Sequence, residues 1–117
     1  MNFGNEINPA KRRRPPSVTL RILIGEKKRQ IDVRSFPCVV GRLKEEADIV
    51  CKDASVGKRH AIIDFADNKL TIIDNYSRNG VEVDGLKLIP NLPRELFQGD
   101  HIILGRAGID IIKIRNE

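Results

Sequence analysis

Several residue types are scarce in this 117-residue chain, and each scarcity excludes a class of protein. There is no Trp, with one Tyr and four Phe, so the core must be aliphatic and aromatic platforms that stack nucleic-acid bases are not expected. No apolar run approaches the ~20 residues that a membrane-spanning helix requires. The opening segment "MNFGNEINPAKRRRPPS" lacks the apolar stretch of a secretory signal, so we expect a cytoplasmic protein with no membrane contact.

Only two cysteines are present, and their spacing supports neither a metal site nor a disulfide framework. Cys38 lies in "FPCVV" and Cys51 in "DIVCK", both apolar segments typical of strands. We expect both side chains to be buried as small hydrophobic groups. The sequence therefore predicts no metal and no cofactor.

Positive charge is concentrated at the N-terminus. Residues 1–17 carry Lys11, Arg12, Arg13 and Arg14 against Glu6, a net charge of +3 out of +5 for the whole chain. With three prolines and few apolar residues, this segment predicts a disordered basic tail, followed by a folded domain over residues 18–115. A solvated tail is the simplest interpretation. In a eukaryotic cell the cluster would suit nuclear import, and it would add only weak, salt-sensitive binding to nucleic acid.

Beyond Val18 the chain reads as a succession of short strands. In "VTLRILI", one face of the predicted strand carries Val18, Leu20, Ile22 and Ile24, and the other carries Thr19, Arg21 and Leu23. This period of two is typical of a half-buried strand. No window shows helical periodicity, and Gly, Asn and Asp separate the apolar segments. The further predicted strands are "RQIDV", "PCVVG", "DIVC", "HAIIDFA", "KLTIID", "VEV", "LKLI", "HIILG" and "IDIIKI". About 10–11 short strands predict an all-β fold, a two-sheet antiparallel β-sandwich.

A Gly-Arg pair stands at the end of one predicted strand. Gly41 allows the backbone unusual dihedral angles there, and Arg42 offers a fork of donors suited to an anion. The alternative is an ordinary surface ion pair of Arg42 with an acidic residue of the next loop, namely Glu45, Glu46 or Asp48.

The segment "SVGKRHA" places glycine and two cations before a strand. Gly57 offers an unobstructed backbone amide that could form part of an anion-binding nest, while Lys58 and Arg59 add charge. We expect His60 to be buried and to join two loops by hydrogen bonds. An acid–base pair of His60 with Asp53 or Asp74 would lack a nucleophile and an orienting group, so we predict no enzyme.

Two later turns complete the set. In "NYSRNG", the Asn79-Gly80 pair is a strong turn signal. Asn79 either supplies a left-handed dihedral angle alone or offers its amide to a ligand. At "QGD" we expect Asp100 to cap backbone amides without further chemistry.

Taken in order and at these spacings, the motifs resemble the forkhead-associated (FHA) domain family over Val18 to Ile114. The resemblance implies a two-sheet sandwich whose loops at one end bind peptides that contain phosphothreonine. It also implies a recognition module and not an enzyme. A partial match of "NYSRNG" to the PilZ cyclic-dinucleotide signature lacks the arginine pair that this signature requires.

The resemblance assigns roles to individual residues. Arg42 would contact the phosphate, Lys58 the phosphate or peptide, and Asn79 the ligand backbone. His60 would hold the recognition loop. Gly41 and Gly80 would shape the strand end and the turn.

Two positions depart from the family pattern. Gly57 stands where the family has a phosphate-binding serine, and Arg78 stands where it has threonine or serine. A lost hydrogen bond to a charged group costs about 1.5–3 kcal/mol. Arg78 either compensates through paired N–H groups or blocks the pocket. Two functions therefore stay open, recognition of a phosphothreonine-containing partner protein and a phospho-independent interaction scaffold.

The partner would be the substrate of a Ser/Thr kinase. The chain's own threonines, Thr19 and Thr71, both lie in predicted strands, so we do not expect an intramolecular phosphothreonine switch. We expect a monomer.

Overall fold

The computed structural model describes residues 16–116, so the predicted disordered tail falls almost entirely outside the described residues. These residues form eleven strands and no helix. The strands are β1 (Ser17–Ile24), β2 (Lys27–Val33), β3 (Cys38–Gly41), β4 (Ile49–Val50), β5 (Ala61–Ala66), β6 (Lys69–Asp74), β7 (Val81–Val83), β8 (Leu86–Lys87), β9 (Arg94–Leu96), β10 (His101–Leu104) and β11 (Ala107–Arg115).

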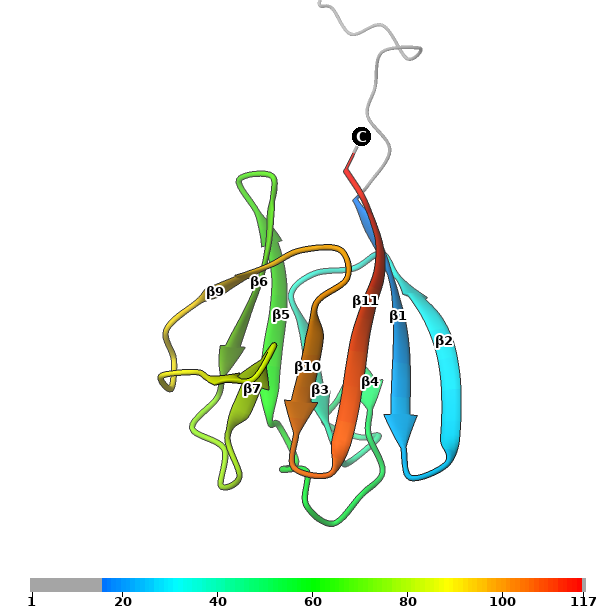
Figure 1. The fold of residues 1–117 in the computed structure, drawn as a ribbon, viewed down its shortest axis with the longest axis vertical. Coiled ribbons are helices and arrows are strands. Elements are labelled where there is room, and N and C mark those ends of the chain that lie inside the picture. The colour runs from blue at the N-terminus through cyan, green and yellow to red at the C-terminus, as the bar shows by residue number, and fades with distance from the viewer. Residues whose placement is uncertain (1–15, 117) are drawn as a thin grey trace, which may run out of the picture.

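The strands form two facing sheets (Figure 1). One has six strands in the order β2-β1-β11-β10-β7-β8, and the other has five in the order β4-β3-β5-β6-β9. Neighbouring strands are antiparallel except β3 and β4, which run parallel over two residue pairs. The predicted two-sheet sandwich is confirmed.

The core between the sheets is aliphatic, as the scarcity of aromatic residues predicts. The alternation in β1 buries Val18, Leu20 and Ile22, because successive side chains of a strand point to opposite faces. Both cysteines are buried in the same core, Cys38 at 2% exposure and Cys51 at 0%.

Three strands differ from the prediction. β9 was missed because only Leu96 of its three residues is apolar and buried, and it exists through its pairing with β6. β2 begins at Lys27, two residues before the predicted "RQIDV", because its exposed lysines pair with β1 at the sheet edge. The predicted strand "LKLI" is reduced to Leu86–Lys87.

The sheets bring four connections to one end of the sandwich, the lower end in Figure 1. They are the β3–β4 loop (42–48), the β4–β5 loop (51–60), the β6–β7 loop (75–80) and the β10–β11 turn (105–106). We call this the loop end. The β1–β2 turn lies at the same end, and the β5–β6 turn lies at the opposite one. Within residues 16–116 there is no helix long and apolar enough to cross a membrane.

Candidate functional site

His60 joins the two loops that flank the candidate site. Its side chain is 1% exposed. The Gly57 amide donates to Nδ1 at 2.9 Å, and Nε2 lies 2.7 Å from the Gly80 carbonyl oxygen. Because Nδ1 accepts, the ring proton is on Nε2 and donates to Gly80. The predicted buried, loop-joining histidine is confirmed.

The same geometry corrects the expectation for Gly57. Its backbone amide is not free for an anion, since it points inward to His60 Nδ1. The Lys58 amide, one residue later, makes no hydrogen bond within residues 16–116. The neighbouring Lys58 amide is therefore an available backbone donor of this loop.

Glycine is required at position 41 because of a close contact, and not because of an unusual dihedral angle. This corrects the expectation that Gly41 allows unusual backbone dihedral angles at the strand end. A Cβ atom at Gly41 would overlap the carbonyl oxygen of Lys58. The β4–β5 loop thus lies directly on the end of β3. This contact brings Lys58 beside the end of β3, which Arg42 directly follows.

Arg42 is hydrogen-bonded to the β4–β5 loop through its backbone amide and through the Nε atom of its guanidinium group. Its amide donates to the Gly57 carbonyl, and its Nε donates to the Val56 carbonyl, both at 2.9 Å. No ion pair within residues 16–116 includes Arg42. Glu45, Glu46 and Asp48, the alternative partners predicted from the sequence, therefore form no ion pair with it. Asp48 instead accepts a hydrogen bond from the Val39 amide. The N–H groups of the two terminal Nη atoms therefore remain available to a ligand.

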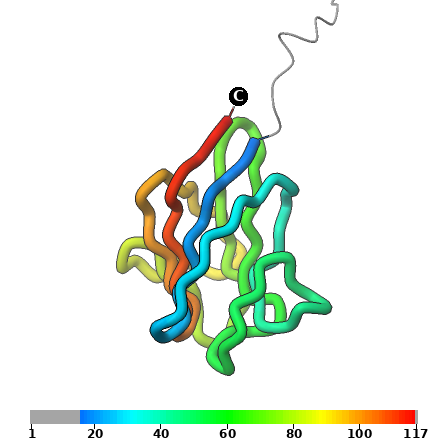
Figure 2. Tube along the Cα trace, turned by 90° about the vertical axis from the view of Figure 1, so that its right-hand side faces the viewer, coloured from blue at the N-terminus to red at the C-terminus, as the bar shows by residue number. Residues whose placement is uncertain are grey.

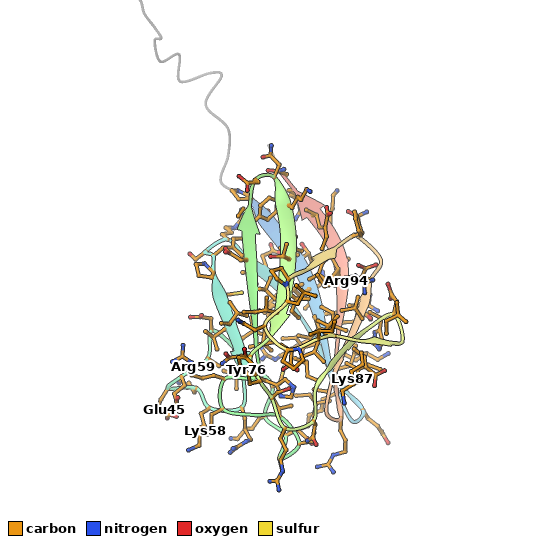
Figure 3. The ribbon with its side chains drawn as sticks, turned by 90° about the vertical axis from the view of Figure 1, so that its left-hand side faces the viewer. Glu45, Lys58, Arg59, Tyr76, Lys87 and Arg94 are labelled. Atoms are coloured by element: carbon orange, nitrogen blue, oxygen red, sulfur yellow. The ribbon has the colours of Figure 1, made fainter. Side chains whose placement is uncertain are left out.

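Three further cations lie in two loops of the loop end, the β4–β5 and β6–β7 loops. Lys58, Arg59 and Arg78 are exposed, and no ion pair within residues 16–116 involves them. Figure 3 shows Lys58 and Arg59 at the loop end, near Tyr76 and Glu45. The structure thus presents unneutralised positive charge here.

Asn79 has a role that the turn signal alone did not indicate. Its Nδ2 donates to the Ser55 carbonyl at 2.8 Å. The left-handed dihedral angle belongs to Gly80, with φ of 75°, so Asn79 does more than shape the turn. One amide hydrogen and Oδ1 remain for a ligand backbone.

Ser55 is a supporting residue that sequence reasoning missed. Its hydroxyl lies 2.5 Å from Asp53 Oδ2 and accepts from the Arg106 amide at 2.7 Å. Arg106 also pairs with Asp53, with Nη2 at 3.2 Å from Oδ2. The Ser55 hydrogen bonds, followed by the charge of Arg106, lower the pKa of Asp53. The Asp-x-Ser spacing could have indicated the local bond, but nothing local indicated the contact with Arg106.

The predicted site residues are only partly connected. Hydrogen bonds through His60 and the β4–β5 loop link Arg42, Gly57, Asn79 and Gly80. The side chains of Lys58 and Arg78 make no hydrogen bond within residues 16–116. As predicted, Asp100 caps the Phe97 amide at 2.8 Å.

No group of three His, Cys, Asp or Glu side chains in the described residues could hold a metal ion. Around His60, the neighbouring groups are backbone amides and carbonyls. The arrangement is suited to holding loops and to presenting cations.

Several known structures are similar to this chain in fold. The FHA domain of the CT664 protein from Chlamydia trachomatis is 29% identical, with a TM-score of 0.74, and the match covers 83% of this chain and 97% of that chain. The FhaA FHA domain, complexed with the intracellular domain of Rv3910, is 28% identical with a TM-score of 0.69, covering 84% and 99%. The Slr1951 protein from Synechocystis sp., at 24% identity and a TM-score of 0.73 over 86% and 99%, shares the fold.

No curated protein matches the chain significantly. The model of the FHA domain family, however, matches residues 38–105, which span the site from Cys38 of β3 to Gly105 of the last turn. This fold generally mediates phosphothreonine-dependent protein interactions, and its members are interaction modules and not enzymes. With the motifs, the fold similarity and the family match in agreement, the chain belongs to the FHA domain family.

Proposed function

We propose that this protein binds phosphothreonine-containing partner proteins through its loop end. The observation that carries the proposal is the position of Arg42, whose Nε and amide are anchored to the β4–β5 loop while its Nη groups keep their donors. An arginine held in this way can bind phosphate with paired N–H groups without a large loss of side-chain entropy.

The remaining phosphate donors would come from neighbouring positions. Lys58 would supply its ammonium group and its unpaired amide, and Arg78 would supply a second guanidinium group where the family has threonine or serine. Asn79 would bond the peptide backbone with the half of its amide that Ser55 does not use. Each charged hydrogen bond contributes about 1.5–3 kcal/mol, so Arg78 could replace the missing serine hydroxyl.

One observation favours the second candidate, a phospho-independent interaction scaffold. Gly57 has no hydroxyl group, and its amide is already bonded to His60. Two donors at this position are therefore lost to a phosphate. On this alternative, binding would occur without phosphate at other surfaces of the sandwich.

The deciding experiment is an amide-shift titration of the isotope-labelled protein with a degenerate phosphothreonine peptide pool. We expect shifts at Arg42, Lys58 and Asn79 that require the phosphate. The unphosphorylated pool and an Arg42→Ala variant are the controls, and both should give no shifts. Equal shifts with both pools would favour the scaffold, and no shifts at millimolar peptide would rule out phosphothreonine binding.

Gly57 allows a complementary gain-of-function test. A Cβ atom there would lie 3.7 Å from His60 Nδ1, an ordinary contact, so a serine fits. Gly57→Ser should strengthen phosphopeptide binding by about tenfold to a hundredfold, since it restores a donor to a charged group. Gly57→Ala is the matched control and should leave affinity unchanged. If both variants bind as the parent does, this position does not face the phosphate.

A further inference from the structure

A second positively charged surface lies beside the candidate site and is separate from it. A groove of about 940 Å³ runs between the β1–β2 hairpin and the start of the β4–β5 loop. Ile22, Ile24 and Val50 provide its apolar part. We call it the β2 groove. Figure 2 looks onto this edge of the molecule, with β2 in cyan.

The strand register shows why cations line this groove. Lys27 pairs with Ile24 and Arg29 with Ile22, and directly paired residues project to the same face of a sheet. Since Ile22 faces the core, Lys27 and Arg29 also project to the core side of their sheet. They nevertheless remain exposed. Lys52 adds a further cation from the β4–β5 loop.

The acidic residues of the groove do not neutralise it. Glu26 and Asp53 also line it, but Asp53 is already paired with Arg106 and hydrogen-bonded by Ser55. Arg29 donates from Nη2 to the Val50 carbonyl and so spans the groove to β4. The groove therefore combines an apolar surface with a positive rim.

The neighbouring backbone is suited to an extended ligand. Within residues 16–116, β2 is hydrogen-bonded to β1 alone and forms the edge of the six-stranded sheet. It is seven residues long. Such an edge offers amides and carbonyls to an added strand. Lysines on an edge discourage pairing with a second, equally basic copy, but they attract an acidic segment.

We propose that the β2 groove binds an extended, acidic segment of a partner protein that adds to the edge of β2. Carboxylates of the segment that point to the core side of the sheet would meet Lys27, Arg29 and Lys52, while the alternate side chains would point to the opposite face. The chain's own residues 11–14 are basic and would repel this rim. The proposal is independent of phosphothreonine binding, because it uses neither Arg42 nor Lys58.

The test uses a synthetic peptide of alternating glutamate and valine, without phosphate, and the full chain. We expect amide shifts in Lys27–Val33 and Val50–Asp53, slower hydrogen exchange along β2, and affinity that falls with added salt. The same peptide with glutamine in place of glutamate should bind at least about tenfold more weakly.

Variants separate the groove from general positive charge. Combined Lys27→Glu and Lys52→Glu should weaken binding by about tenfold or more, while Lys69→Glu at the opposite end should not. All three lysines are exposed, so the variants should fold. The proposal is overturned if no shifts occur, if the glutamine peptide binds equally well, or if the shifts fall at Arg42 and Lys58. If the β2 amides exchange slowly without peptide because the protein forms a dimer, the proposal is also overturned, and the β2 edge binds a second copy of this chain.

Discussion

At the scale of single residues, two glycines of the candidate site have opposite requirements. Gly41 has no space for a side chain because the Lys58 carbonyl lies against it, whereas Gly57 has space for one. The first glycine therefore positions the recognition loop. The second is a chemical departure from the family without a steric reason.

This contrast predicts different effects of the same substitution. Gly41→Ala should lower the free energy of unfolding by about 1–3 kcal/mol, because its Cβ would displace the β4–β5 loop. Gly57→Ala should leave it unchanged or raise it by up to about 1 kcal/mol, since alanine restricts the unfolded chain. Denaturant unfolding of the two variants measures both values. Equal effects would contradict the close contact at Gly41.

At the scale of structural elements, the β4–β5 loop is held by three others. β3 contacts it at Gly41, the β6–β7 loop through His60 and Asn79, and the β10–β11 turn through Ser55. A Cβ atom at Gly105 would overlap Ser55. The loop that carries Lys58 is thus shaped before any ligand binds, which reduces the entropic cost of recognition.

Removing one of these contacts should loosen the loop without unfolding the domain. Ser55→Ala deletes the hydroxyl that joins Asp53 to the Arg106 amide. We expect a loss of about 1–2 kcal/mol in the free energy of unfolding and faster amide exchange at Arg106. Ser35→Ala, at an exposed serine, is the control and should change neither. Unchanged exchange at Arg106 would show that the turn is held by other contacts.

At the scale of the whole molecule, an aliphatic core with two buried thiols holds the sheets together. Burial, aided by Asp48 and Asp64, raises the pKa of Cys38 to about 12. Burial likewise raises the pKa of Cys51 to about 11, although Arg29 opposes the shift. Both thiols stay neutral in the folded state at pH values where unfolded thiols, with a pKa of about 8.5, ionise.

The sign of this effect gives a pH prediction. Because the unfolded chain loses protons first, the stability contributed by the neutral thiols is complete below about pH 8.5 and declines as the pH rises toward the folded pKa values. The folded protein should also react slowly with a thiol reagent near pH 8 and rapidly after denaturation. Fast labelling of both cysteines without unfolding would contradict their burial.

Much of the fold could be predicted because its signals are local. Alternation of apolar residues identified ten of the eleven strands, and the scarcity of aromatic residues predicted an aliphatic core that includes both cysteines. β9 could not be predicted, since Arg94–Leu96 has little alternation and pairs only because β6 lies beside it.

For the site, the sequence by itself determined which residue types are present, namely Arg42, Lys58, His60 and Asn79 at the family's spacing. Only the tertiary structure decided what each atom contacts. The Gly57 amide turns to His60, and Ser55 meets Arg106 across 51 positions of the chain. Such contacts depend on strand register and on how loops from two sheets meet, and a short stretch of sequence carries no trace of either. The β2 groove has the same origin, because the pairing of β2 with β1 turns Lys27 and Arg29 toward the core side of the sheet.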